Sequence, residues 1–111
     1  MADEELMSEL HHLRAAGGLT LAKLEACPTL LKALGAQSAE EGKERLEQRL
    51  DQLSDDDKRV LVNAFNLSEH GSDTQFQRRA GYAAEFGTAD SAVERWEDDA
   101  MHRLAALLGQ R

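Results

Sequence analysis

Residues 74–108 read TQFQRRAGYAAEFGTADSAVERWEDDAMHRLAALL, and this stretch decides the fold because its local signals agree on two consecutive helices. Asp73 or Thr74 can cap the first helix, which is predicted to run to about Phe86. Gly87 is expected to end it. The inner face of this helix is predicted to carry apolar residues at helical spacing: Phe76, Ala80, Ala83 and Ala84.

The second helix of the pair is predicted over about 92–108. Ser91 and Glu94 form a capping-box sequence, in which both side chains can accept free backbone amides at the helix start. The apolar residues then recur at spacings of three and four, as one buried helical face requires: Val93, Trp96, Ala100, Leu104, Leu107 and Leu108. A short turn separates the helices, so the stretch predicts a helix-turn-helix-like hairpin.

Similar start and stop signals extend toward the N-terminus. A helix is predicted over about residues 3–16. Thr20 can cap a short second helix, which Pro28 breaks or kinks because proline lacks an amide hydrogen and crowds the preceding turn. The apolar helical face continues after Pro28, and Gly35 can end the helix that carries it.

Two more helices, about 39–53 and 55–67, are predicted in the middle of the chain. Ser38 begins a capping box with Glu41, and Ser54 precedes a first turn of three aspartates, which suits the positive end of the helix dipole. The sequence therefore predicts an all-α fold, a compact bundle of five to six helices that ends in the helix-turn-helix-like hairpin. We expect residues 1–111 to form a single helical domain, either alone or as the N-terminal module of a longer protein.

Negative charge is spread along the whole chain. The formal net charge is −8, and residues 1–37, 38–71 and 72–111 are all net acidic. Long-range attraction to nucleic acid or to anionic lipid is therefore not expected. No apolar run approaches the roughly 18 residues of a membrane span. The acidic N-terminus does not resemble a secretory signal, and Cys27 is the only cysteine, so we expect a cytoplasmic protein without a membrane partner.

The hairpin also carries a family resemblance. Arg78 to Glu97, RRAGYAAEFGTADSAVERWE, resembles the helix-turn-helix of many actinobacterial regulators and of sigma-factor region four. In those families an alanine packs inside the first helix, a glycine opens the turn, and Ser or Thr followed by Val begins the recognition helix. The matching residues here are Ala83, Gly87, Ser91 and Val93. The resemblance, over residues 76–108, implies a bacterial regulator whose last helix could enter the major groove of DNA.

Four arginines are the candidates for contact with nucleic acid under that reading: Arg78, Arg79, Arg95 and Arg103. Carboxylates surround them, because Asp90 and Glu94 are expected to be exposed at the helix start, with Glu97 and its two acidic neighbours one turn further. Carboxylates repel phosphates, and DNA-binding proteins usually present a basic face. Charge therefore favours a hairpin used for protein contact or as scaffold.

Two aromatic residues of the hairpin are candidates for binding a partner. Trp96 is expected to anchor the core with its indole at the edge, and the alternative is a partly exposed anchor of the kind enriched at interface hot spots. Tyr82, which lies off the main apolar stripe, could be a second anchor.

No catalytic or metal site is predicted. His11 and His12 are adjacent on a helix and diverge, while His70 and His102 belong to distant segments. Cys27 has no basic neighbour that would activate its thiol. The chain contains neither a Gly-rich phosphate loop nor a nucleophile motif. We therefore expect a protein that is not an enzyme and that needs no cofactor and no small-molecule substrate.

The preferred hypothesis is a protein–protein interaction or adaptor module that could serve a regulatory role and whose acidic surface favours a basic partner. That partner is another protein or a second copy of the chain. The alternative is a DNA-binding transcriptional regulator that uses the C-terminal helix-turn-helix.

Overall fold

The computed structural model describes residues 2–15, 18–67 and 74–109, and for residues 2, 3, 75 and 76 it describes the backbone alone. These parts of the chain are helical and contain no strand. The helices are α1 (Ala2–Arg14), α2 (Leu21–Glu25), α3 (Pro28–Leu34), α4 (Ala39–Leu50), α5 (Asp55–Ala64), α6 (Gln75–Glu85) and α7 (Asp90–Gly109). The predicted all-α class is confirmed.

The described residues form seven helices rather than the five to six predicted. The difference arises at Pro28, which does not kink one helix but begins a new one at its first position. Proline suits that position because the first amides of a helix lack an intrahelical acceptor in any case. Cys27 supplies no side-chain cap there. The carboxylate of Glu9 on α1 accepts the amides of Thr29 at 3.2 Å and Leu30 at 2.7 Å instead.

The predicted polar caps are confirmed at four helix starts, where a hydroxyl accepts the amide three residues on: Thr20, Ser38, Ser54 and Thr74. At Thr74 the capping box is reciprocal with Gln77. Asp73, the other candidate cap, lies outside the described residues. At Ser38 the predicted box is incomplete, since Glu41 accepts the amide of Gln37 instead.

The predicted cap at Ser91 is wrong. Helix α7 already begins at Asp90, and the amides of Ala92 and Val93 donate to the carbonyl oxygen of Ala89. Ser91 therefore lies inside the first turn. The preceding helix ends as predicted, with Gly87 at φ +63° after the last turn of α6.

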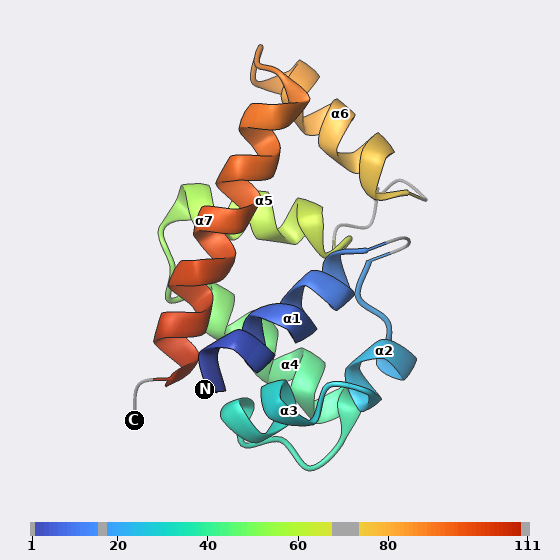
Figure 1. The fold of residues 1–111 in the computed structure, drawn as a ribbon, viewed down its shortest axis with the longest axis vertical. Helices are drawn as coiled ribbons and strands as arrows, with labels where there is room; N and C mark the ends of the chain where they lie inside the picture. Colours follow the sequence, from blue (N-terminus) through green and yellow to red (C-terminus); the bar gives the residue numbers. More distant parts are fainter. Residues whose placement is uncertain (1, 16–17, 68–73, 110–111) are drawn as a thin grey trace.

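Helix α7 is the central element of the packing. It contacts α1, α3, α4, α5 and α6, and in Figure 1 it runs as a long helix beside the others. Helix α6, in contrast, packs on α5 and α7 and lies at the end of the molecule away from α2, α3 and α4. All seven helices contribute buried apolar residues to one cluster.

The buried stripe of α7 differs from the predicted one most clearly at one step, and it also includes Met101 and Ala105, whereas Leu107 is only partly buried. Val93, Ala100, Leu104 and Leu108 are buried as expected, but Trp96 is 40% exposed and Glu97 is only 1% exposed. The spacing permits either residue, because the steps from Val93 to Ala100 can be three and then four residues, through Trp96, or four and then three, through Glu97. Both orders follow a period close to 3.6. Hydropathy favoured tryptophan in the sequence, whereas partners on other helices make the carboxylate the buried one.

A tight backbone contact joins the N-terminal half to α5. The Leu19 amide donates to the Phe65 carbonyl at 2.8 Å. Gly18 precedes it at φ +89°, and a Cβ added there would lie 2.6 Å from the same carbonyl oxygen. Only glycine fits this position without displacing the chain.

No helix among the described residues is long and apolar enough to cross a bilayer.

Candidate functional site

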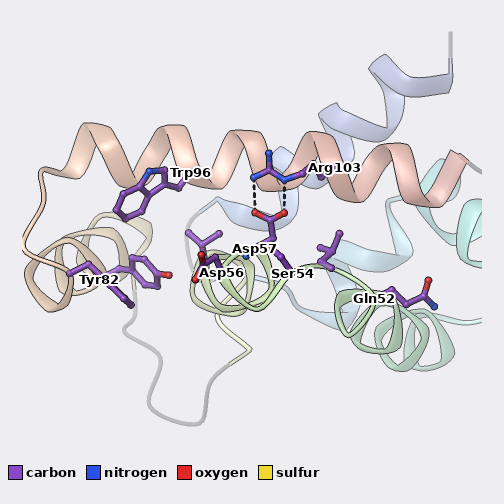
Figure 2. Close-up of a pocket in the computed structure, with 10 residues that line it drawn as sticks. Gln52, Ser54, Asp56, Asp57, Tyr82, Trp96 and Arg103 are labelled. Carbon is purple, nitrogen blue, oxygen red and sulfur yellow. Dashed lines mark hydrogen bonds and ion pairs between the residues drawn. The ribbon is translucent and has the colours of Figure 1, made fainter.

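A cleft of about 800 Å³ opens on one side of α7. The segment between α4 and α5, the first turns of α5, the end of α6 and the outer side of α7 form its walls (Figure 2). Its lining residues are Gln52, Leu53, Ser54, Asp56, Asp57, Val60, Tyr82, Phe86, Trp96 and Arg103. The cleft contains Tyr82 and Trp96, the two predicted partner-binding residues, and Phe86, which the sequence analysis did not single out as an anchor.

The aromatic residues gather at one end of the cleft. Tyr82 and Phe86, one helical turn apart on α6, have ring centroids 4.6 Å apart, and Tyr82 meets Trp96 of α7 edge-on at 6.3 Å and 75°. Phe86 is 41% exposed and Trp96 40%, while Tyr82 is buried. The expected core position of Trp96 is thus corrected to that of a partly exposed anchor. Tyr82 supports the cleft wall and is not an exposed anchor.

The middle of the cleft is charged. Arg103 donates to both carboxylate oxygens of Asp57, through Nη2 at 2.6 Å and through Nε. The hydrogen bond with Asp57 raises the pKa of Arg103. Asp56, the neighbouring residue, is exposed and forms no ion pair within the described parts of the chain. Asp57 is therefore neutralised, and Asp56 gives the cleft lining a net negative charge.

Tyr82 reports the electrostatics of the aromatic end. Burial is the main cause that raises the pKa of its phenol; Arg59 opposes that shift, and Asp56 and Glu85 add to it. The guanidinium of Arg59 lies 5.7 Å from the centroid of the Phe86 ring, a cation–π distance. The Asp56 charge thus acts on the aromatic end of the cleft as well as on its middle.

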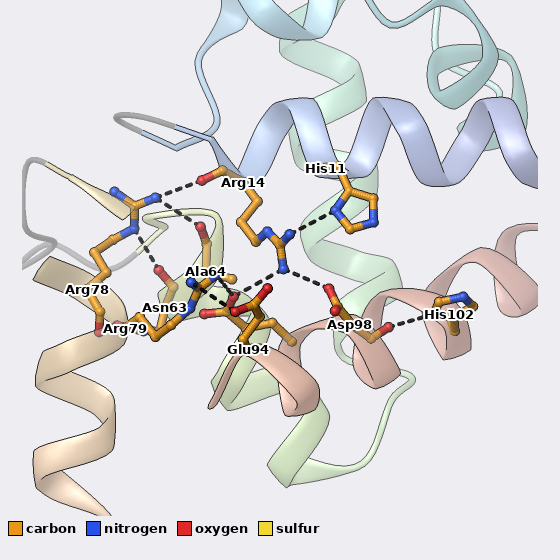
Figure 3. Close-up of polar contacts among 10 residues, drawn as sticks. His11, Arg14, Asn63, Ala64, Arg78, Arg79, Glu94, Asp98 and His102 are labelled. Atoms are coloured by element: carbon orange, nitrogen blue, oxygen red, sulfur yellow. Dashed lines mark hydrogen bonds and ion pairs between the residues drawn. The ribbon is translucent and has the colours of Figure 1, made fainter. Parts of the chain in front are cut away.

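Arg78 occupies a different place, between α1, α5 and α6 (Figure 3). Its side chain is buried and donates to backbone carbonyls of three residues: Arg14 at 3.0 Å, Asn63 at 3.1 Å and Ala64 at 3.2 Å. The Asn63 side chain donates back to the Arg78 carbonyl. Burial lowers the pKa of Arg78, with Glu97 acting in the opposite sense. This arginine joins helix ends and does not face solvent.

Glu97 is the centre of a buried ionic cluster that the sequence analysis missed. Its Oε1 accepts Arg79 at 2.9 Å and Arg14 at 3.3 Å, so one carboxylate connects α1, α6 and α7. Arg14 also donates to Asp98 at 2.8 Å, and Arg79 lies 3.6 Å from Glu94 (Figure 3). The expectation that Glu97 is exposed was wrong, because two arginines from other helices compensate its charge in the interior.

His11 belongs to the rim of the same cluster. Arg14 donates to its Nδ1 at 2.9 Å, so the imidazole accepts at that nitrogen and is neutral in this arrangement. Burial, followed by the positive charge of Arg14, lowers the pKa of His11, and Asp98 partly opposes the shift. His11 is thus held neutral by its position next to a buried arginine.

The four arginines proposed for nucleic acid do not form one surface. Arg78 and Arg79 are buried and bonded within the chain, so contact with phosphate would require them to leave their partners. Arg103 is exposed but is engaged by Asp57 in the cleft. Arg95 is exposed on α7. Among the described residues these arginines therefore do not form a continuous basic surface along the hairpin.

The remaining candidate groups show no arrangement for metal binding in the parts of the chain described. Those parts contain no cluster of three His, Cys, Asp or Glu side chains that could hold an ion, and His70 lies outside them. Cys27 is buried, and burial, with the nearby Glu9, raises the pKa of its thiol to about 11. Such a thiol is almost entirely protonated at neutral pH, which makes it a poor nucleophile.

Compared with protein-family models, with curated proteins and with solved structures, the chain has no significant match. The functional argument therefore depends on the geometry of the cleft and of the arginine cluster.

Proposed function

We propose that this chain is a non-enzymatic protein-interaction domain, and that the cleft binds a segment of another protein. One observation carries the proposal: Phe86 and Trp96, two of the large apolar residues most exposed in the described structure, line the same cleft. Exposed aromatic residues that gather in a concave site commonly mark interfaces, because their burial supplies much of the binding energy.

The surroundings of the two rings support a protein segment as the ligand. Val60 and Leu53 extend the apolar wall, while Gln52, Ser54 and Asp56 offer polar groups at the margin. An apolar centre with a polar margin is the usual composition of a protein interface. The strongly acidic chain would also attract a basic partner and raise its association rate.

Internal bonding of the arginines argues against the DNA-binding alternative. A recognition hairpin needs several basic side chains free to contact phosphates. Arg78 and Arg79 have buried partners, and α7 exposes Asp90 and Glu94 beside Arg95. We accordingly propose that the hairpin of α6 and α7, which resembles a helix-turn-helix, serves as a scaffold that places Phe86 and Trp96 in the same cleft.

Peptide display tests the proposal. A phage library of random 14-residue peptides is selected against three proteins: the unaltered chain, the Phe86→Ser/Trp96→Ser double variant, and a Leu21→Ser control. Leu21 is a matched control because it is 40% exposed, like Trp96, but lies on α2 away from the cleft. We expect peptides that bind the unaltered chain and the control and bind the double variant at least about tenfold more weakly. If no enriched peptide depends on the two aromatic residues, the proposal is wrong.

Two further measurements address the other partners. The fluorescence anisotropy of a labelled DNA duplex of mixed sequence is expected to show no binding at low salt. Binding that falls steeply with salt and is lost in Arg95→Glu would favour the DNA-binding regulator instead.

Light scattering is expected to give a monomer. A dimer that the Phe86→Ser/Trp96→Ser variant dissociates would make a second copy of the chain the occupant of the cleft.

A further inference from the structure

On the basis of the function proposed above, we infer that the partner segment is an amphipathic helix with a bulky apolar side chain and, three or four residues away, a lysine or arginine. The apolar side chain enters the aromatic end of the cleft, beside Trp96 and Phe86. The basic side chain reaches the carboxylate of Asp56.

The order of groups along the cleft gives this pattern its spacing. Figure 2 shows Asp56 between the aromatic pair Tyr82 and Trp96 on one side and the Asp57–Arg103 pair on the other. Trp96 and Arg103 are seven residues apart on α7, so the cleft follows about two helical turns, roughly 10 Å. A partner helix presents side chains about 5–6 Å apart when they are three or four residues apart, so an apolar and a charged side chain at that spacing both fit within these two turns.

The backbone of this domain favours a helical partner over an extended one. Extended peptides usually bind by adding a strand to a sheet edge, and the described residues contain no strand. Recognition must then come from side chains in a groove. An amphipathic helix supplies them on one face at the required spacing.

The charges in the cleft favour a basic side chain at the polar position. Arg103 already compensates Asp57, whereas Asp56 has no compensating cation among the described residues. Arg59 lies over the ring of Phe86 and is not one of the cleft-lining residues. Because Arg59 already covers that ring face, a cation from the partner would pair with Asp56 instead. A second copy of this chain is a poor source of such a segment, because each third of the sequence is net acidic.

A charge reversal at Asp56 tests the inference. The same random library is selected against Asp56→Lys and against Asp55→Lys. The control is matched, because Asp55 is the neighbouring exposed aspartate in the first turn of α5 and does not line the cleft. Both substitutions change the net charge and the helix terminus equally, and circular dichroism checks that both proteins are folded.

We expect peptides selected on the unaltered chain and on Asp55→Lys to share an apolar residue and a Lys or Arg three or four positions away. They should bind Asp56→Lys at least about tenfold more weakly, since attraction becomes repulsion. Peptides selected on Asp56→Lys should carry Glu or Asp at that position. If Asp56→Lys selects the same basic peptides, the inference is wrong and the proposed function stands. If the enriched peptides do not depend on Phe86 and Trp96, both are wrong.

Discussion

Two regions of this molecule, the cleft and the buried ionic cluster around Glu97, differ in how they treat adjacent residues of α7. Trp96 lies in the cleft and is partly exposed, whereas Glu97 is buried between Arg14 and Arg79. The usual preference, with the aromatic inside and the carboxylate outside, is reversed at this step. The buried charge is satisfied by partners within the chain, while the exposed ring lacks an equivalent cover. The contrast separates a group that serves the fold from one that is available to a partner.

Replacement of Glu97 is expected to give the largest effect. Glu97→Gln leaves Arg14 and Arg79 in the interior without their shared counter-charge, and breaking a buried pair in this way typically costs about 3–5 kcal/mol. Urea unfolding followed by circular dichroism measures the loss. Glu94→Gln is the control, because Glu94 is exposed and lies 3.6 Å from Arg79, and its effect should stay below about 1 kcal/mol. Equal effects for the two variants would remove the distinction between fold and surface.

Loss of the partly exposed ring should disturb the fold less than loss of Glu97. Trp96→Ser is expected to lower the free energy of unfolding by about 1–2 kcal/mol, because two fifths of the residue is already accessible to water and only the remaining contact area is lost. Urea unfolding of this variant and of Leu21→Ser provides the comparison. A loss as large as that of Glu97→Gln would show that Trp96 belongs to the core after all.

The Asp57–Arg103 pair should give an intermediate effect. Arg103→Gln removes the partner of a mostly buried carboxylate, but the guanidinium is more than half exposed and well solvated. A loss of about 1 kcal/mol in the free energy of unfolding is therefore expected. The same variant leaves Asp57 uncompensated in the cleft, so basic peptides from the display experiment should bind it more tightly. Weaker binding would indicate that Arg103 itself contacts the partner.

The smallest expected effect is a pH dependence at the rim of the buried cluster. The pKa of His11 is lowered in the folded chain, so a proton binds the unfolded chain more readily. The stabilisation is complete above the unfolded pKa of about 6.5 and is lost as the pH falls through 6.5 toward the lower folded value. Unfolding at pH 7.5 and 5.5 should show a smaller decrease for His11→Gln than for the unaltered chain. His12→Gln, one residue away and exposed, should retain the full decrease.

The fold was largely predictable because its signals are local. Capping hydroxyls at Thr20, Ser38 and Ser54, and glycine after α6, act within one turn and can be seen in the sequence. The first residue of α7 could not be decided in this way, since Ser91 and Ala89 both precede a helical pattern. The amides of Ala92 and Val93 donate to the carbonyl oxygen of Ala89, and these backbone bonds place the helix start before Ser91.

The candidate site was less predictable because its residues are selected by tertiary partners. Helical spacing admits Trp96 and Glu97 equally, and the choice depends on Arg14 on α1, 83 residues away. Arg78 looks like a solvent-facing residue in the sequence, yet carbonyl groups at helix ends hold it inside. Phe86 could have been found, because it lies four residues after Tyr82 at the end of a helix and next to the predicted turn.

The position of the single tryptophan has an optical consequence. Because Trp96 is partly hydrated in the folded chain and lines the cleft, its emission should shift strongly to the blue when a ligand covers it and only modestly to the red when the chain unfolds. The native indole thus gives a label-free titration signal for cleft occupancy. Global unfolding is better followed through helix content.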